Sequence, residues 1–365
     1  MTDPRFSPEN YQQQLLDKTQ HIKTLFAACN IPAPEVFSSP ATGFRMRAEF
    51  KIWHEGDESY YAMYRQGEYK TPYRITEFPQ AHDNIRRLMP LLLDEINSNE
   101  LLRRKLFQVE FLTTLKGETL ITLIYHKKLD DTWQAEAEAL RARLGVFMIG
   151  RSRKQKLVLG QDFVTETLEV NGRPYHYQQI ESSFTQPNAR VCEKMLGWAV
   201  QHTTPCTGDL VELYCGNGNF TIPLAANFNR VMATELAKSS VHSARYNMAL
   251  NKVDNIDIAR MSSEEFSAAL DKQRSFRRLK DIDLDSFNFS TIFVDPPRAG
   301  LDPHTTAITQ GYQTIIYISC NPETLHRDLQ TITHTHDVAA FALFDQFPFT
   351  HHIECGAILK KRSQA

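Results

Sequence analysis

The 365-residue chain contains neither a long apolar run nor a paired-cysteine motif. No apolar stretch approaches the roughly 18 residues that a membrane helix requires, and the opening MTDPRFSPENYQQQ lacks the apolar region of a secretory signal. A C-x-x-C pair is also missing, which disfavours a disulfide framework, a zinc site and an iron–sulphur cluster. We therefore expect a soluble, cytoplasmic protein without a metal centre. Its six cysteines should be free thiols: Cys29, Cys192, Cys206, Cys215, Cys320 and Cys355.

The sequence also lacks an excess of charge of either sign, because its 41 Lys and Arg residues nearly balance its 43 Asp and Glu residues. The net charge of −2 gives no global attraction to nucleic acid or to an anionic membrane. Any polyanionic partner would have to be held by a shaped local patch. With 42% hydrophobic and 23% charged residues, the composition is that of an ordinary globular protein, and the length suits about two domains.

Residues 1–180 have the pattern of an α+β domain. A helix start at Ser7-Pro8 and apolar residues at helical spacing predict a helix that ends near Cys29. In FRMRAEFKIWH, apolar and polar residues alternate, which predicts a strand with one buried face. YYAMYRQGEYKTPYRI and LFQVEFLTTLKGETLITLIYH predict antiparallel hairpins, the first turning at Gln66-Gly67, and DDTWQAEAEALRARLG predicts a further helix.

Residues 181–365 instead show short apolar strands alternating with helices: DLVELYC, RVMATEL, NIDIARM, TIFVDPP and TIIYISC. This alternation predicts a Rossmann-like α/β domain with a parallel sheet. The last two strands, DVAAFALF and HHIECGAILKK, have no helix between them and predict an antiparallel hairpin at the sheet edge. The sheet should thus be seven-stranded and mostly parallel with an antiparallel final strand. The charged stretch DKQRSFRRLKDIDLDSF reads as a solvated loop.

A glycine loop and an acidic strand end follow one another in this second domain. Gly216 and Gly218 come directly after the first strand, where a ligand can approach the backbone closely. A dinucleotide site would place a third glycine where the chain has Thr221, which disfavours NAD. Glu235 ends the second strand, and its carboxylate could accept hydrogen bonds from ribose hydroxyls, although it could also be a surface acid. S-adenosylmethionine fits this pattern better than a dinucleotide, because it has a ribose but no phosphate.

Two further polar groups end the fourth and fifth strands. Asp295 begins the sequence DPPRAG, and Cys320 ends TIIYISC, so both should lie at the ligand-binding edge of a parallel sheet. An antiparallel final strand would bring His352 and Glu354 to the same edge. Taken alone, Cys320 could be a buried core thiol. A thiol and a carboxylate over an S-adenosylmethionine site suit methylation of a pyrimidine at carbon 5, in which the thiolate adds to carbon 6 and the carboxylate removes the carbon-5 proton.

Several motifs, taken in order, resemble those of the RNA uracil-5-methyltransferases: SFTQPN, VELYCGNGNF, FVDPPRAG, YISCNPET and DQFPFTHHIEC. FRMRAEFKIWH and YHKKLDD extend the resemblance over nearly the whole chain. The resemblance implies an S-adenosylmethionine-dependent methyltransferase domain at 181–365, preceded by an α+β RNA-binding domain at 1–180. It also implies that Cys320 is the nucleophile and Glu354 the base. The cofactor and uracil sites would be lined by Gln186, Tyr214, Gly216, Asn219, Glu235 and Asp295.

The resemblance further favours tRNA as the substrate. Relatives that act on large-subunit ribosomal RNA carry a four-cysteine iron–sulphur cluster, whereas Cys29 is the only cysteine before residue 190 here. The implied target is the T-loop uridine at position 54 of tRNA, which becomes 5-methyluridine, and tRNA-like RNA is a further expected partner. We expect the protein to act as a monomer.

The RNA-contacting residues are less closely defined by the sequence. Arg45 and Arg47 lie on the polar face of their predicted strand, Phe107 follows the basic triplet at 103–105, and Arg298 lies in FVDPPRAG. Phosphate contact and base stacking would suit these residue types, but a solvated strand face and a core aromatic explain them equally well. A T-loop uridine is stacked inside the folded tRNA, so an enzyme that methylates it must flip the base out.

Two other classes of protein remain compatible with the residues. An amino-group methyltransferase could use the DPPR motif, and it would need no thiol. A non-catalytic RNA-binding or chaperone protein would need neither the cofactor nor the thiol.

Overall fold

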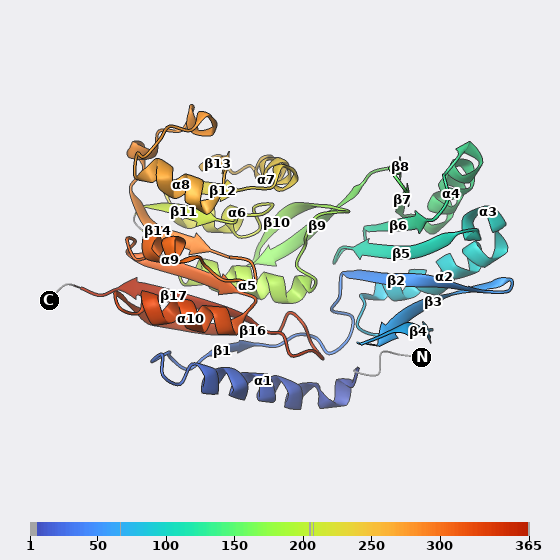
Figure 1. The fold of residues 1–365 in the computed structure, drawn as a ribbon, viewed down its shortest axis with the longest axis horizontal. Coiled ribbons are helices and arrows are strands. Elements are labelled where there is room, and N and C mark those ends of the chain that lie inside the picture. Colours follow the sequence, from blue (N-terminus) through green and yellow to red (C-terminus); the bar gives the residue numbers. More distant parts are fainter. Residues whose placement is uncertain (1–5, 66, 204–205, 207, 364–365) are drawn as a thin grey trace. The chain divides into compact units, whose positions relative to one another are not determined.

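A computed structural model describes residues 6–65, 67–203, 206 and 208–363, and the chain divides into two compact units (Figure 1). The first unit consists mainly of Pro40–Thr167 and Gln178–Ala189, and the second of Asn10–Ser39, Leu168–Tyr177 and Arg190–Ala365. The sequence patterns place residues 1–180 in one domain and 181–365 in another, whereas Asn10–Ser39 and Leu168–Tyr177 fall in the second unit and residues 181–189 in the first. Asn10–Ser39 lies in the second unit because its three-residue strand, β1 (Glu35–Phe37), which is too short to show a period, pairs there.

The first unit is built on a seven-stranded sheet in the order β4-β3-β2-β5-β6-β7-β8. Its strands are β2 (Arg47–Glu55), β3 (Glu58–Arg65), β4 (Glu68–Ile75), β5 (Leu106–Thr113), β6 (Thr119–Tyr125), β7 (Phe147–Ser152) and β8 (Gln155–Leu159). Neighbouring strands are antiparallel except for the parallel pair β6–β7. The two predicted hairpins are confirmed as β3–β4 and β5–β6, although Gln66 of the first predicted turn lies outside the described residues.

Helices cover one face of this sheet: α2 (Asp83–Ser98), α3 (Glu100–Arg103) and α4 (Asp131–Leu144). Helix α4 begins because the Asp130 side chain accepts the backbone N–H of Trp133, and it ends at Gly145, which takes the left-handed conformation. The alternation along β2 sends Phe50 and Ile52 into the core formed with α2 and α4. The opposite face of β2 therefore carries polar side chains.

The second unit contains an eight-stranded sheet in the order β1-β16-β17-β15-β14-β11-β12-β13. Besides β1, its strands are β11 (Asp209–Leu213), β12 (Val231–Glu235), β13 (Ile256–Arg260), β14 (Phe289–Val294), β15 (Thr314–Ser319), β16 (His336–Phe344) and β17 (Glu354–Lys361). Strand β17 is antiparallel to β15 and to β16, and the other neighbouring pairs are parallel. The predicted Rossmann-like arrangement is confirmed, but the sheet has eight strands rather than the expected seven, because β1 joins it. The final hairpin is not at the edge as expected, because β1 pairs with the outer side of β16.

Helices lie on both faces of this sheet. They are α1 (Tyr11–Leu25), α5 (Ala189–Gln201), α6 (Thr221–Leu224), α7 (Lys238–Leu250), α8 (Ser263–Leu270), α9 (Pro303–Thr309) and α10 (Pro322–Ile332). Side chains of α1, α8 and α10 share a core with Cys355, Ala357 and Leu359 of β17. The intervening Gly356 faces the other way, where a Cβ would lie 2.7 Å from the Trp198 ring of α5. The sheet is therefore the middle layer of an α/β/α sandwich.

Two remaining segments complete the chain. The stretch at 271–287, expected as a solvated loop, contains the short helices η3 (Arg277–Leu279) and η4 (Leu284–Ser286). Its apolar residues, which include Phe276 and Ile282, pack against the core, so they explain why the stretch is ordered. The strands β9 (Phe163–Val170) and β10 (Arg173–Ile180) pair with each other. Within the described part of the chain, no helix combines the length and apolar character needed to cross a membrane.

Candidate active site

The site lies at one edge of the second sheet, where β14, β15 and β17 are neighbours. Asp295 follows the last residue of β14, and Cys320 follows the last residue of β15. Strand β17 begins at Glu354, and Ser319 pairs with Cys355 across the antiparallel register. The next positions along the two strands are Cys320 and Glu354, so the expected meeting of thiol and carboxyl is what the sheet produces.

Burial raises the proton affinity of all three of these side chains. The pKa of Glu354 is raised to about 8 by its burial, with a further increase from the negative charge of Asp295. Burial raises the pKa of Asp295 to about 7. For Cys320, burial and then the charges of Glu354 and Asp295 raise the pKa to about 11, while the positive charge of Arg298 opposes them. The edge thus holds a thiol beside two carboxyls that gain and lose protons near neutral pH.

The glycine loop adjoins this edge, since β11 lies next to β14. Its backbone takes the left-handed conformation at Tyr214, Gly216 and Gly218, with φ of 63°, 57° and 83°. The Glu235 carboxylate accepts the N–H of Gly216 at 3.1 Å and that of Ala237 at 2.7 Å. A Cβ added to Gly216 would meet nothing within 4 Å, so there is open space in front of the loop. Glu235 therefore holds the loop backbone on one side, while the side of Gly216 that a Cβ would occupy is open, which suits a loop that binds a nucleoside.

Tyr214 and Asn219, both predicted at the cofactor site, are also held from within the second unit. The Tyr214 hydroxyl lies 2.9 Å from the Ser263 Oγ of α8. The backbone carbonyl of Asn219 accepts a hydrogen bond from the Tyr177 hydroxyl at 3.0 Å, and its Nδ2 lies 3.4 Å from the Cys192 Sγ. These contacts fix the two ends of the glycine loop.

Glu212 is a residue of this region that the sequence analysis did not single out. It lies on β11 with 1% of its surface exposed, and burial followed by the charge of Asp295 raises its pKa to about 8. The Thr221 hydroxyl lies near enough to this carboxyl to oppose the rise in its pKa, but among the described residues neither the Glu212 Oε2 nor the Thr221 Oγ1 has a partner with full hydrogen-bond geometry, and both atoms are buried. Such atoms suit a bound group with hydrogen-bond donors. The residues present therefore fit S-adenosylmethionine, whose ammonium and ribose hydroxyls are donors.

The other predicted residues lie in the first unit or on the loop after β14. Gln186 belongs to the Gln178–Ala189 segment of the first unit. Arg298 is exposed on the loop that starts at Asp295, and its charge lowers the pKa of both Cys320 and Glu354. Across the described residues, no group of three or more His, Cys, Asp or Glu side chains is arranged to hold a metal ion.

The basic residues predicted for RNA contact are partly engaged within the first unit. Arg47 donates through Nη1 to the Glu181 carbonyl at 2.8 Å and through Nη2 to the Ser183 carbonyl at 3.0 Å. The Arg45 Nε donates to the Arg47 carbonyl at 3.0 Å. Arg47 therefore anchors the chain segment at 181–183.

Phe107 forms the centre of a half-exposed stack. Its ring lies parallel to that of His126 with 4.2 Å between centroids, and the Lys51 Nζ lies 4.0 Å from the Phe107 centroid. Sequence analysis missed His126 and Lys51 as neighbours of Phe107. His126 falls within YHKKLDD, a stretch that resembles the RNA uracil-5-methyltransferases, so the resemblance already indicated His126 as a candidate functional residue.

Comparison with known proteins identifies the family. The model of the tRNA (Uracil-5-)-methyltransferase family matches residues 10–362. The chain belongs to this family. It is 56% identical over 364 residues to the tRNA/tmRNA (uracil-C(5))-methyltransferase of Vibrio vulnificus (strain YJ016), covering 98% of each chain. Against the enzyme of the same name from Cellvibrio japonicus, it is 57% identical over 357 residues, covering 98% of this chain and 97% of the other.

A solved structure shows the same fold as this family member. The Pyrococcus abyssi tRNA (uracil-54, C5)-methyltransferase, solved in complex with S-adenosyl-L-homocysteine, aligns with a TM-score of 0.71 and 22% identity. The alignment covers 96% of this chain and 83% of that chain. The family, the fold and the enzyme class implied by the sequence motifs are therefore confirmed.

Proposed function

We propose that this methyltransferase transfers a methyl group from S-adenosylmethionine to carbon 5 of the T-loop uridine, position 54, of tRNA through a covalent Cys320–uracil adduct. The observation that carries the proposal is the placement of the Cys320 thiol beside the Glu354 carboxyl at one sheet edge. An amino-group methyltransferase would need the cofactor loop and Asp295 but not this pair. The curated relatives are named for tmRNA as well as tRNA, and we propose tmRNA as a second substrate.

The thiol supplies the nucleophile that the pyrimidine ring lacks. Cys320 adds to carbon 6 as the thiolate, a carbon–sulfur bond forms, and the electrons of the ring double bond move towards the carbonyl oxygen at carbon 4. Carbon 5 of the resulting enolate is then nucleophilic. S-adenosylmethionine, when bound, would supply the methyl group that carbon 5 takes, with the bond from the methyl group to the positively charged sulfur breaking and S-adenosylhomocysteine as the leaving group. The positive charge of Arg298 favours both the thiolate and the enolate.

The carboxyl completes the reaction. Glu354, in its ionised form, takes the proton from carbon 5, the ring double bond re-forms and the bond from carbon 6 to the Cys320 sulfur breaks. Its raised pKa, about 8, makes it a stronger base than an exposed carboxylate. Gly216, Tyr214, Asn219 and Glu235 would hold the cofactor, and Asp295 would reach both cofactor and uracil. Gln186 remains a predicted cofactor residue.

The first unit would supply the RNA-binding surface. Its sheet presents the Lys51–Phe107–His126 stack, which combines a cation with one exposed ring, that of His126, on which a base can stack. Arg45, Arg47 and Arg298 remain predicted phosphate contacts. Such a surface would compensate for the stacking that the uridine loses when it is flipped out.

The test of this function separates the two catalytic residues. Cys320→Ala should form no RNA adduct and no product with labelled S-adenosylmethionine and unmodified tRNA, because no enolate can form. Glu354→Gln should transfer the methyl group and then stall, because an amide does not accept the carbon-5 proton. We expect a protein–RNA species that survives denaturing electrophoresis and carries the methyl label.

Cys29→Ala provides the matched control, since it removes another half-buried thiol and should behave as the wild type. Mapping the label in the wild-type product should place it at uridine 54. Activity retained by Cys320→Ala would favour an amino-group methyltransferase, and label on another nucleotide would refute the proposed substrate.

A further inference from the structure

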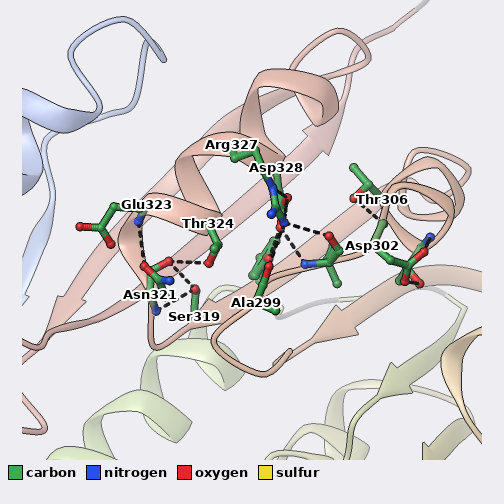
Figure 2. Close-up of polar contacts among 12 residues, drawn as sticks. Ala299, Asp302, Thr306, Ser319, Asn321, Glu323, Thr324, Arg327 and Asp328 are labelled. Carbon is green, nitrogen blue, oxygen red and sulfur yellow. Dashed lines mark hydrogen bonds and ion pairs between the residues drawn. The ribbon is translucent and has the colours of Figure 1, made fainter.

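The loop that carries Asp295 and Arg298 is bound along its backbone by the helix that follows Cys320 (Figure 2). Asn321 caps α10, and its Nδ2 donates to the Arg298 carbonyl at 2.9 Å. Further along the helix, the Arg327 Nη2 donates to the Ala299 carbonyl at 3.0 Å and to the Leu301 carbonyl at 2.9 Å. The side chains of one helix therefore hold three successive parts of this loop.

A buried carboxylate, Asp328, joins the loop, the helix and strand β15. Its Oδ2 accepts the N–H of Leu301 at 2.9 Å and the hydroxyl of Tyr317 at 2.6 Å, and its Oδ1 accepts from Arg327 at 2.8 Å. Asp328 is only 3% exposed. Charge-assisted bonds of this kind are about twice as strong as neutral ones. The Arg327–Asp328 pair thus forms a clamp, drawn in Figure 2, on the loop at 299–301.

Gly300 shows how closely the clamp approaches the loop. A Cβ at this position would lie 2.7 Å from the Arg327 Nη2, 2.8 Å from the Thr324 Cβ and 2.9 Å from the Asp328 Oδ2. The residue also has a φ of +75°, which a side chain would strain. Because residue 300 is a glycine, no side chain lies between the loop and the helix at this position. The distance between the loop backbone and α10 is therefore set by direct contact.

The clamp has a consequence for the charged groups around the thiol. Cys320 faces Glu354 from β17 and Asp295 from the loop after β14, both of which disfavour the thiolate, whereas Arg298 favours it. Arg298 is exposed, and an exposed arginine side chain loses rotamer entropy when it is held in one place. The helix binds the Arg298 carbonyl, which accepts hydrogen bonds from Asn321 and, at 3.4 Å, from Thr324.

We propose that Arg327 is a positioning residue: with Asp328 it holds the loop so that Arg298, whose carbonyl is bound by Asn321 next to Cys320, brings its positive charge to the Cys320 thiol. Arg327 suits this role because its planar fork reaches two carbonyls and a carboxylate at once, which a lysine cannot do. The importance of the clamp for turnover rests on the proposed role of Cys320 as nucleophile. The placement of Arg298 can be measured without turnover, tRNA or cofactor.

The experiment compares two alkylating reagents of similar size on the full-length protein at pH 7. Iodoacetate is an anion and iodoacetamide is neutral, so the ratio of their rate constants at one thiol reports the local positive charge. The rates are followed by mass spectrometry of the peptide that contains Cys320. Cys29 serves as the internal reference, because burial alone raises its pKa and no charged group contributes.

We expect Arg298→Met to lower the ratio at Cys320, by about threefold to tenfold for one unit charge at close range. Arg327→Met should lower it by a similar factor, and the double variant should match Arg298→Met alone, because Arg327 acts through Arg298. Arg362→Met, which removes an exposed arginine paired with Asp337 in the same unit, should leave the ratio unchanged. The ratio at Cys29 should be constant throughout.

A wild-type ratio in Arg327→Met overturns the proposal, and so does a drop that persists in full in the Arg298→Met background. If thermal unfolding shows that Arg327→Met does not fold, Arg327→Lys is measured instead by the same two criteria; it keeps the charge but loses the fork. If the adduct experiment fails while the alkylation ratio at Cys320 still falls in Arg298→Met and Arg327→Met, the covalent mechanism is refuted and the clamp stands.

Discussion

At the scale of single residues, Glu235 connects the cofactor loop to the strand that ends beside it. Its two oxygens bind the N–H groups of Gly216 and Ala237, and each carboxylate oxygen has a further lone pair for a ligand.

We expect Glu235→Ala to weaken S-adenosylmethionine binding by about 1–3 kcal/mol, because ribose hydroxyls lose their acceptors and stay desolvated. Calorimetry measures this affinity, and gel shift should show unchanged tRNA binding. Asp254→Ala, at an exposed carboxylate of the same unit, is the control. Lost tRNA binding with intact cofactor affinity would contradict this role.

Individual residues also show where sequence patterns stop being informative. Cys320, Asp295 and Glu354 could be placed together because strand ends of an α/β sheet share an edge. The partners of Arg47 and the clamp of Arg327 could not be predicted, since their acceptors are backbone carbonyls, which every residue carries. Glu212 was passed over because a carboxyl in an apolar strand looks like an interruption until its burial is seen.

At the scale of elements, α1 is fastened to the loop between β16 and β17 by a buried ion pair. The Lys18 Nζ lies 2.7 Å from the Asp345 Oδ1, and the side chains are 6% and 0% exposed. The Nζ also donates to the Phe347 carbonyl at 3.0 Å. Helix α1 itself was predictable from its spacing, but it ends at Leu25 rather than near Cys29, and its location in the second unit depends on contacts with the far end of the sequence.

The pair leads to a stability prediction. Lys18→Met should lower the free energy of unfolding by about 3–5 kcal/mol, because Asp345 would remain as an uncompensated buried charge. Adding Asp345→Asn should recover part of this loss. Urea unfolding measures both, and Lys23→Met, at an exposed lysine of the same helix, should cost little. Full stability in Lys18→Met would show that the ion pair does not hold α1.

At the scale of the whole molecule, the acids of the site should make stability depend on pH, because Glu212 and Glu354 are buried and Asp295 is partly buried. Glu212, Asp295 and Glu354 have pKa values raised to about 8, 7 and 8, chiefly by burial, from ordinary values of 4.5, 3.8 and 4.5. At a pH between the ordinary and the raised pKa of a group, the folded state binds more protons than the unfolded state. The contribution of each group to stability is therefore complete below about pH 4 and is lost as the pH rises through 7 to 8.

Glu354→Gln should remove its share of this dependence. At pH 9 the variant should be more stable than the wild type by about 5 kcal/mol, at 1.36 kcal/mol for each pKa unit, while at pH 4 the two should be similar. Urea unfolding at both pH values measures the difference, with the exposed Glu77→Gln as control. An equal difference at pH 4 and pH 9 would mean that Glu354 does not carry a raised pKa.

The pairing of β1 with β16 also governs the order in which the protein can fold during synthesis. Glu35 and Ala342 are register partners, although nearly all of the first unit is translated between them. The first unit can fold while the ribosome is still working, because its strands pair over short distances along the chain. Helix α1 and β1 must instead wait, with their apolar sides unpaired, until the last strands emerge. Closing so long a loop slows folding, and the nascent chain would need protection from aggregation until then.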